Sequence, residues 1–195
     1  MTIAFFDFDG TITRGDSFAL FLKFILGKRF YIKILCNIHI LFLYKLGIYN
    51  NAKTKQSVLE SCLGGMEQIT LEQKCQAFCR KLESYCKDSA LTKIQWHKEQ
   101  GHKVVLVSAS FEEYLRPLCK KLGIELLATT MEVKNGIVTG NFGHPNCYGV
   151  EKVHRIKATY NLCDYTSIYV YGDTRGDKEM LELASKKQGF YRVFY

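Results

Sequence analysis

The first strong signal in the sequence is an apolar run that ends in two acids. Ile3–Phe6 has the length and composition of a buried strand, and Asp7 and Asp9 follow it directly. Ionised carboxylates desolvate badly, and acids at positions i and i+2 of an extended chain lie on the same side and repel each other. The pair therefore indicates a functional site at the end of a buried strand.

Strand and helix patterns alternate over most of the chain. The pattern predicts strands at 3–8, 103–107, 125–128, 168–171 and 190–194, and helices at 88–100, 111–122, 149–160 and 176–187. A β-hairpin is expected at 131–142, because Asn135-Gly136 is a strong turn signal. This order is typical of an α/β fold with a doubly wound, Rossmann-like parallel sheet.

One long segment departs from the alternation. Residues 16–86 show helical periodicity only, with a break at Gly64-Gly65. We therefore expect a helical cap, residues 14–86, inserted after the first strand of a core formed by residues 1–13 and 87–195. The length of 195 residues and the hydrophobic content of 47% suit one such core with an inserted module.

Polar residues gather where the predicted strands end, which is where ligands bind in such sheets. They are Asp7 and Asp9, Ser108-Ala109-Ser110, Lys152 at the start of a helix, and Asp173 and Asp177. Four neighbouring carboxylates would repel one another, and a hard divalent cation with oxygen ligands, such as Mg²⁺, would relieve the repulsion. A serine hydroxyl, a lysine and backbone N–H groups would suit a phosphate dianion.

This ordered set resembles the motifs of the haloacid dehalogenase (HAD) superfamily of phosphohydrolases. The four marks are DFDGT from Asp7, the serine of VSAS, the lysine of GVEKV, and GDTRGD ending at Asp177. A helical insertion directly after the first motif is similar to the cap of subfamily IB, the phosphoserine-phosphatase-like branch. The resemblance implies an enzyme, a phosphatase of HAD type, that requires Mg²⁺.

The resemblance also implies a role for each matching residue. Asp7 would be the nucleophile that forms an aspartyl-phosphate, and Asp9 would be the general acid and then the general base. The metal ligands would be Asp7, the backbone carbonyl of Asp9, and Asp173. Asp177 would bind the metal through water or orient Lys152.

The phosphate group would be held by three residues. Ser108 and the N–H of Ala109 would bind its oxygens, and Lys152 would neutralise charge that develops in the transition state. Arg175 lies inside the last motif, where it would meet either substrate or solvent.

The substrate stays open between a small soluble phosphate and a lipid phosphate. A phosphoserine enzyme typically has a glutamate soon after the first motif, and here Asp16 would have to replace it among basic and aromatic residues. The other alternative is a lipid phosphatase, because the layout resembles the branch that includes the bacterial phosphatidylglycerophosphate phosphatase. A non-catalytic phosphate-binding protein is the alternative of another class, although binding alone needs no nucleophile.

The positive charge is concentrated near the predicted cap. The whole chain carries +8, and residues 14–55 contain eight basic residues against Asp16 alone, a net charge of +7. Residues 18–48 are strongly apolar but are interrupted by lysine and arginine, so we do not expect a full membrane span. This segment either packs inside the protein or makes peripheral contact with an anionic membrane. Nucleic acid is a weaker alternative, since no binding module is visible.

The cysteines bear on the compartment. The eight cysteines form no CxxC pair and no zinc-ligand spacing, which favours free thiols in a reducing cytoplasm. The early acids also do not fit the basic start of a signal peptide. We expect a cytoplasmic protein, with the inner membrane surface as the alternative location.

Overall fold

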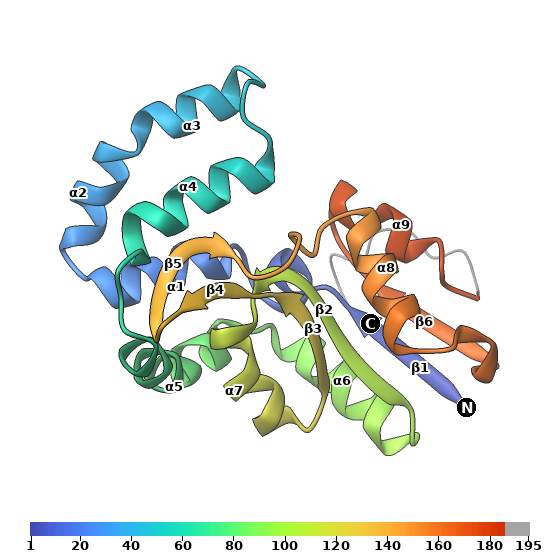
Figure 1. The fold of residues 1–195 in the computed structure, drawn as a ribbon. Coiled ribbons are helices and arrows are strands. Elements are labelled where there is room, and N and C mark those ends of the chain that lie inside the picture. The colour runs from blue at the N-terminus through green and yellow to red at the C-terminus, as the bar shows by residue number, and fades with distance from the viewer. Residues whose placement is uncertain (186–195) are drawn as a thin grey trace.

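A four-stranded parallel sheet forms the centre of the protein in the computed structural model, which describes residues 1–185 (Figure 1). The strand order is β3-β2-β1-β6. The bounds are β1 (Thr2–Phe6), β2 (Lys103–Phe111), β3 (Glu125–Thr129) and β6 (Ser167–Tyr171). Phe5 of β1 aligns with Val105 of β2 on one side and Val170 of β6 on the other. The predicted α/β class with a parallel sheet is confirmed.

Helices cover both faces of the sheet, so its strands are apolar throughout rather than alternating. They include α6 (Asp88–Glu99), α7 (Glu112–Leu122), α8 (Val150–Thr159) and the short α9 (Lys178–Leu181). Successive residues of β1 serve opposite faces: Phe5 packs in one cluster with Ile156 of α8, and Phe6 packs in another with Tyr114 of α7. This double burial brings the strand ends, and the polar residues that follow them, to one edge.

The predicted hairpin is present beside the sheet. It consists of β4 (Met131–Lys134) and β5 (Ile137–Phe142), which pair antiparallel. Asn135 and Gly136 join them with φ angles of 51° and 76°, the double left-handed geometry that an Asn-Gly turn favours.

Five helices follow one another between β1 and α6, in the segment that leads from the first strand towards the second. After the wide turn η1 (Phe8–Ile12) come α1 (Ser17–Leu26), α2 (Arg29–Cys36), α3 (Ile38–Lys45), α4 (Asn51–Leu63) and α5 (Gln68–Tyr85). The two ends of this segment lie side by side, since Thr13 bridges Cys86 and the Lys87 N–H donates to the Ile12 carbonyl at 2.8 Å. The chain therefore leaves the sheet and returns to it at one place.

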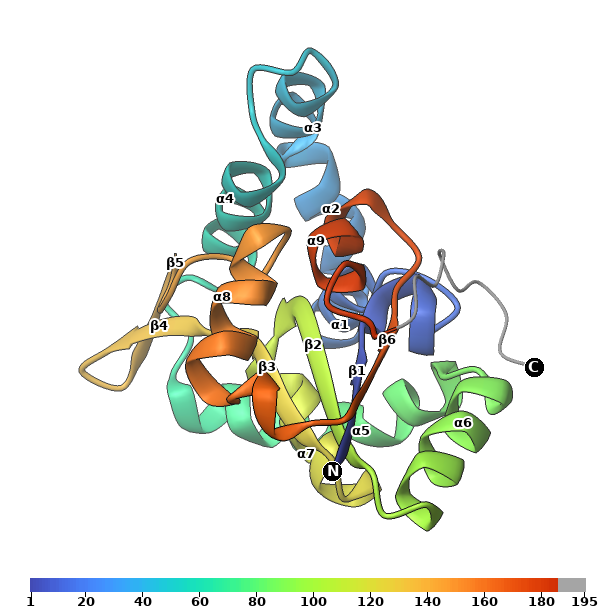
Figure 2. The ribbon, with the colours of Figure 1, turned by 90° about the vertical axis from the view of Figure 1, so that its right-hand side faces the viewer.

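The helices of this segment differ in their position relative to the sheet. α2, α3 and α4 extend away from it, while α5 lies beside α7 (Figures 1 and 2). Phe21 of α1 and Phe78 of α5 are fully buried in the same apolar cluster as Leu106 of β2. One continuous core thus joins part of the insertion to the sheet, and the division at residues 14 and 86 stays a prediction.

Two elements differ from their predicted bounds. Strand β2 runs to Phe111 rather than Val107, with a shift of register against β3 between Ser108 and Phe111. Of the helix predicted over 176–187, the described part contains only α9 (Lys178–Leu181), which follows a 3₁₀ turn at Arg175–Asp177. The chain turns back there, because the Ser185 N–H donates to the Ile168 carbonyl of β6 at 3.1 Å. The strand predicted at 190–194 lies outside the described residues.

The apolar helices do not include a membrane-spanning candidate. Among residues 1–185, no helix combines the length and the hydropathy that crossing a bilayer requires.

Candidate active site

A buried ion triad connects the end of β1 to α8 and to the loop after β6. The Lys152 Nζ lies 2.5 Å from Asp7 Oδ1 and 2.6 Å from Asp177 Oδ1. All three side chains are almost completely buried, which a charged group tolerates only when it is paired. Burial disfavours the Lys152 ammonium, but the two carboxylates outweigh this and raise its pKa. Lys152 therefore stays charged at the centre of the site.

Asp7 is held in an environment that opposes its ionisation. Burial raises its pKa to about 7, and the charge of Asp177 adds to this, while Lys152 acts in the opposite direction. Its backbone N–H donates to the Tyr171 carbonyl at 2.8 Å, which fixes the end of β1 against the end of β6. A cation placed beside Asp7 would favour its charged form.

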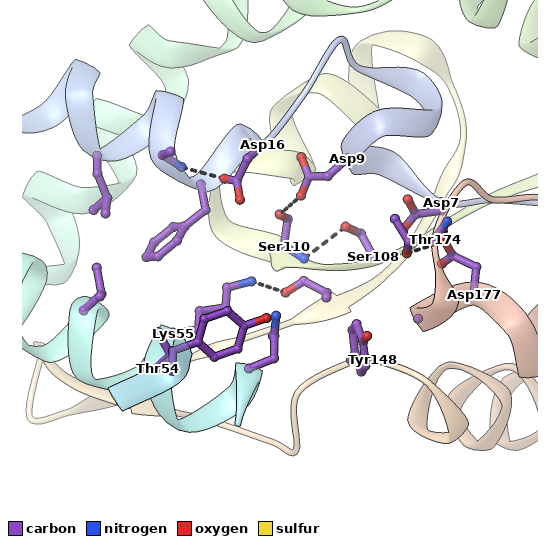
Figure 3. Close-up of a pocket in the computed structure, with 18 of the residues that line it drawn as sticks. Asp7, Asp9, Asp16, Thr54, Lys55, Ser108, Ser110, Tyr148, Thr174 and Asp177 are labelled. Carbon is purple, nitrogen blue, oxygen red and sulfur yellow. Dashed lines mark hydrogen bonds between the residues drawn. The ribbon is translucent and has the colours of Figure 1, made fainter. Parts of the chain in front are cut away.

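The second oxygen of Asp177 shapes the loop after β6. Asp177 Oδ2 accepts the Thr174 N–H and the Thr174 hydroxyl, both at 3.0 Å (Figure 3), and the Asp173 N–H at 3.2 Å. Both carboxylate oxygens of Asp177 are thus engaged with the protein. Asp177 orients Lys152 and the loop, which is one of the two roles expected from the sequence.

Asp9 points away from this triad. Its Oδ1 accepts the Ser17 N–H at 2.7 Å, and its Oδ2 accepts the Ser110 hydroxyl (Figure 3). Burial and then the charge of Asp16 raise the pKa of Asp9, although the hydrogen bonds from Ser110 and Ser17 favour the ionised form. A carboxyl that retains its proton more readily than usual suits a general acid.

The turn between the two acids depends on a glycine. Gly10 has a φ of 83°, and a Cβ at this position would lie 2.2 Å from Asp173 Oδ2. The neighbouring Thr11 hydroxyl donates to Asp173 Oδ1 at 3.3 Å. Gly10 therefore allows the first and last motifs to come together.

The end of β2 forms the opposite wall. The Ser108 hydroxyl accepts the Ser110 N–H at 3.0 Å, and both side chains are buried (Figure 3). Lys55 of α4 reaches this wall, where its Nζ donates to the Ala109 carbonyl at 2.5 Å and lies over the Phe111 ring. Burial lowers the pKa of Lys55 to about 8 despite the charges of Asp9 and Asp16.

A cavity of about 500 Å³ opens above these groups. Its polar end contains Asp7, Asp9, Ser108, Ala109 and Lys152. Its other end is an apolar wall from α1 to α4, namely Phe18, Leu22, Phe30, Ile34, Tyr44 and Val58. The cavity can accept a molecule with an anionic end and an apolar end.

The residues near Asp7 suit a divalent cation. Carboxylate oxygens of Asp7, Asp173 and Asp177 lie within 4.8 Å of one another. Such hard oxygen donors match Mg²⁺. Asp7 and Asp173 are the side chains that the sequence motifs assign as direct ligands, and both belong to this group of carboxylates. Asp177 binds Lys152 and Thr174 with its two oxygens.

The structure brings together all the site residues predicted from the sequence. Lys152, rather than the exposed Lys157 on the same helix, is the lysine that reaches Asp7. Arg175 is exposed. Sequence reasoning missed Ser17 and Lys55. It placed Ser110 at the strand end, two residues after Ser108, but gave it no role.

The fold, the order of the motifs and this geometry define a class of hydrolases. Residues 4–182 match the haloacid dehalogenase-like hydrolases, and the chain belongs to this family. The resemblance seen in the sequence is thereby confirmed, and the chain is an enzyme of this class.

Individual relatives extend over nearly the whole chain. Protein CicA of Caulobacter vibrioides (strain NA1000 / CB15N) is 33% identical over 192 residues, which cover 97% of this chain and 85% of that protein. A protein of unknown function from Bordetella pertussis Tohama I has a similar fold, with a TM-score of 0.83, 21% identity, and coverage of 95% and 87% of the two chains. A phosphoserine phosphohydrolase-like protein from Francisella tularensis subsp. tularensis SCHU S4 has a TM-score of 0.66, 19% identity, and coverage of 93% and 82%.

Proposed function

We propose that the protein is a Mg²⁺-dependent phosphomonoester hydrolase that works through an aspartyl-phosphate on Asp7. The observation that carries this proposal is the separation of two carboxyl groups on one turn. Asp7 is bound to Lys152 and lies beside Asp173, whereas Asp9 is held apart by Ser17 and Ser110. A phosphate-binding protein would need the cationic groups but no second acid with a raised pKa.

The first half-reaction would transfer the phosphoryl group to the enzyme. An Asp7 carboxylate oxygen attacks phosphorus, and the bond from phosphorus to the ester oxygen breaks. Asp9 donates its proton to that leaving oxygen. Ser108, the Ala109 N–H and Lys152 bind the phosphoryl oxygens, where negative charge must be stabilised.

The second half-reaction would release phosphate. Asp9, now ionised, takes a proton from water as the water attacks phosphorus, and the bond to Asp7 breaks. A bound Mg²⁺, held by Asp7, Asp173 and the Asp9 carbonyl, would offset the negative charge of the carboxylates and the phosphate. Lys152 keeps its position throughout because Asp177 holds its other side.

The cavity favours an ester larger than phosphoserine. Asp16 and Lys55 both line it and could meet an ammonium and a carboxylate, which is the specific observation in favour of phosphoserine. The apolar wall beyond them, which includes Leu22, Phe30 and Ile34, would have no partner in that substrate. A phosphomonoester with an apolar part would contact both ends of the cavity, and we therefore propose it as the first candidate substrate.

The test measures phosphate release from phosphoserine, sugar phosphates, nucleotides, long-chain alkyl phosphates and p-nitrophenyl phosphate. Each substrate is measured with Mg²⁺ and with EDTA. Asp7→Asn should lower turnover at least about 10⁴-fold, because it removes the nucleophile. Asp164→Asn, which changes an exposed acid elsewhere, is the matched control and should keep wild-type turnover.

A burst experiment tests the role of Asp9 separately. The p-nitrophenolate group leaves without a proton, so Asp9→Asn should still phosphorylate Asp7 and release about one equivalent of nitrophenolate before turnover slows. Loss of both the burst and turnover would contradict the assignment of Asp9 to proton transfer. Full activity of Asp7→Asn would contradict the aspartyl-phosphate.

A further inference from the structure

The helices α2 and α3, together with the turn that follows α3, expose an unusually apolar surface. We call it the apolar face; its members are Tyr31, Ile32, Leu35, Ile38, Phe42, Tyr44, Leu46 and Ile48, each 47–68% exposed. Among the described residues, these are eight of the fourteen large hydrophobic side chains that are exposed. Tyr31 and Leu35 are one turn apart on α2, and Ile38 and Phe42 are one turn apart on α3. A cluster of this kind marks an interaction site.

The apolar face is not a core that has failed to pack, because the same helices are attached through their other side. The Asn37 side chain, only 4% exposed, donates to the Ser61 hydroxyl of α4 at 3.0 Å. The Lys33 Nζ donates to the Ser61 carbonyl at 2.5 Å. These bonds fix the inner side of α2 on α4 and leave the apolar face directed to solvent.

The segment that carries the apolar face is strongly basic, and Lys23 lies over the ring of Tyr31 at 5.9 Å. Between Ser17 and Leu59 the sequence holds seven basic residues and no aspartate or glutamate. The basic residues that are exposed there are Lys23, Lys28, Arg29, Lys45 and Lys53. Apolar and cationic groups on one surface are complementary to an anionic bilayer, where the apolar side chains enter the interface and the cations meet lipid phosphates.

Two other partners fit this surface less well. Self-association would place two strongly cationic segments against each other, and like charges oppose such an interface. Nucleic acid would satisfy the cations but would leave aliphatic side chains such as Ile32, Leu35 and Ile38 without a role.

The apolar face is continuous with the cavity. Phe30 and Ile34 of α2 line the cavity, and Tyr44 both lines it and belongs to the apolar face. The wall then passes Leu22 and reaches the polar end with Asp7. An acyl chain could follow this path while its phosphate lies at the catalytic residues.

We propose that the apolar face binds the surface of a bilayer containing anionic phospholipid, and that the substrate is a phosphomonoester of an amphiphile presented there. The second part rests on the proposed function; the first does not, because binding needs no turnover. Catalysis and docking can therefore fail separately.

The experiment is co-sedimentation with vesicles of phosphatidylcholine alone or mixed with phosphatidylglycerol, using wild type and the inactive Asp7→Asn. Both proteins should bind the mixed vesicles at least tenfold more tightly than the neutral ones. Leu35→Gln and Phe42→Gln should each weaken this binding several-fold. Ile69→Gln is the matched control, since Ile69 on α5 is 67% exposed and Leu35 is 68% exposed.

Charge is tested with a second pair of variants. Lys28→Gln with Lys45→Gln should weaken binding to the mixed vesicles, and Lys120→Gln with Lys157→Gln, which removes two exposed lysines elsewhere, should not. Hydrolysis of p-nitrophenyl phosphate should stay unchanged in all these variants, which shows that they fold. Activity towards dodecyl phosphate in mixed vesicles should fall with Leu35→Gln and Phe42→Gln.

Three results would overturn the proposal. One is the absence of binding to mixed vesicles by folded protein. Another is vesicle binding that is as strong in Leu35→Gln and Phe42→Gln as in wild type. The same holds if a DNA oligonucleotide abolishes vesicle binding while these two variants do not change it. The third is a dimer in solution that these two variants dissociate, because the face would then join two copies.

Discussion

The catalytic end of the sheet and the α2–α3 region differ in whether their charged side chains have partners of opposite charge. At the strand ends, Lys152 is buried between Asp7 and Asp177, and each charge has a partner from a different element. In α2 and α3, cations lie among exposed apolar side chains with no acid in the segment. A buried charged group is tolerated when an opposite charge of the protein pairs with it. Cations without such partners remain at the surface, where they attract anions from outside the protein.

The strongest test of this contrast removes the buried cation. Lys152→Met should lower kcat at least about 10³-fold, because Asp7 and Asp177 then repel each other and the transition-state charge loses its cation. Its unfolding free energy should also fall by about 3–5 kcal/mol, since two acids are left unpaired in the interior. Steady-state kinetics and urea denaturation measure both.

Lys157→Met is the control, because Lys157 is exposed on the same helix. It should match wild type in both measurements. A Lys152→Met protein with normal turnover would show that charge compensation at the strand ends serves stability alone.

The next test separates close packing from backbone strain at the turn of the first motif. Gly10→Ala should reduce activity about 100-fold, because a Cβ at φ 83° would displace the Asp173 carboxylate. Gly101→Ala has a similar φ of 69° but nothing within 4 Å of its added Cβ. It should lose only about 1–2 kcal/mol of stability and keep its activity. Equal activity losses in the two variants would mean that strain alone is responsible.

Helix α2 has an isoleucine on its cavity side and another on its exposed side, so the two sides can be compared with the same substitution. Ile34→Ala removes part of the cavity wall and should lower kcat/KM for a long-chain alkyl phosphate about 5–10-fold. Ile32→Ala, on the exposed side and 64% accessible, should leave that value unchanged when the substrate is in solution. The reverse order of effects would place the apolar part of the substrate outside the cavity.

A further test concerns the stability contributed by a buried histidine behind the sheet. The His97 Nε2 lies 3.0 Å from the Tyr171 hydroxyl, and its Nδ1 lies 2.8 Å from His102 Nδ1. Burial, aided by His102 and Lys93, lowers the pKa of His97 from 6.5 to about 4. At a pH between 6.5 and about 4, His97 takes up a proton in the unfolded chain but not in the folded protein. The contribution of His97 to the free energy of unfolding therefore decreases as the pH falls.

The measurement is the difference in unfolding free energy between wild type and His97→Gln. Asp7 makes a contribution with the opposite pH dependence, and it cancels in this difference because both proteins contain Asp7. Its pKa of about 7 lets the folded protein bind a proton as the pH falls, which stabilises it. From pH 7 to pH 4, wild type should lose on the order of 3 kcal/mol relative to His97→Gln in denaturation experiments. A difference independent of pH would mean that His97 takes up its proton as readily in the folded protein as in the unfolded chain.

The sheet and the floor of the site could be predicted because they depend on local pattern. Ile3–Phe6, 103–107 and 168–171 are continuous apolar runs, and a parallel sheet brings their ends, with Asp7, Ser108 and Asp173, to one edge. Lys152 could be predicted because its motif starts a helix at the same edge.

The remaining features depend on packing between distant segments. The register of β2 against β3 shifts between Ser108 and Phe111, and the Ser110 hydroxyl in this stretch donates to Asp9. The place of Ser110 at the strand end is visible in the sequence, but neither the shift nor this hydrogen bond is. Lys55 reaches the Ala109 carbonyl only because α4 packs above the strand ends. The short α9 depends on the hydrogen bond between Ser185 and β6, a contact that helix propensity does not contain.

The position of β1 has a consequence for how the chain is made. β1 lies between β2 and β6, and its Ile3 pairs with Lys103 and with Ile168. During synthesis at about 5–20 residues per second, roughly 8–35 s pass before β6 has been translated. Until then one edge of this buried, apolar strand has no neighbour in the sheet. A nascent chain stopped before Ser167 would expose this edge, so we expect chaperones to bind such truncated chains and release the full-length one.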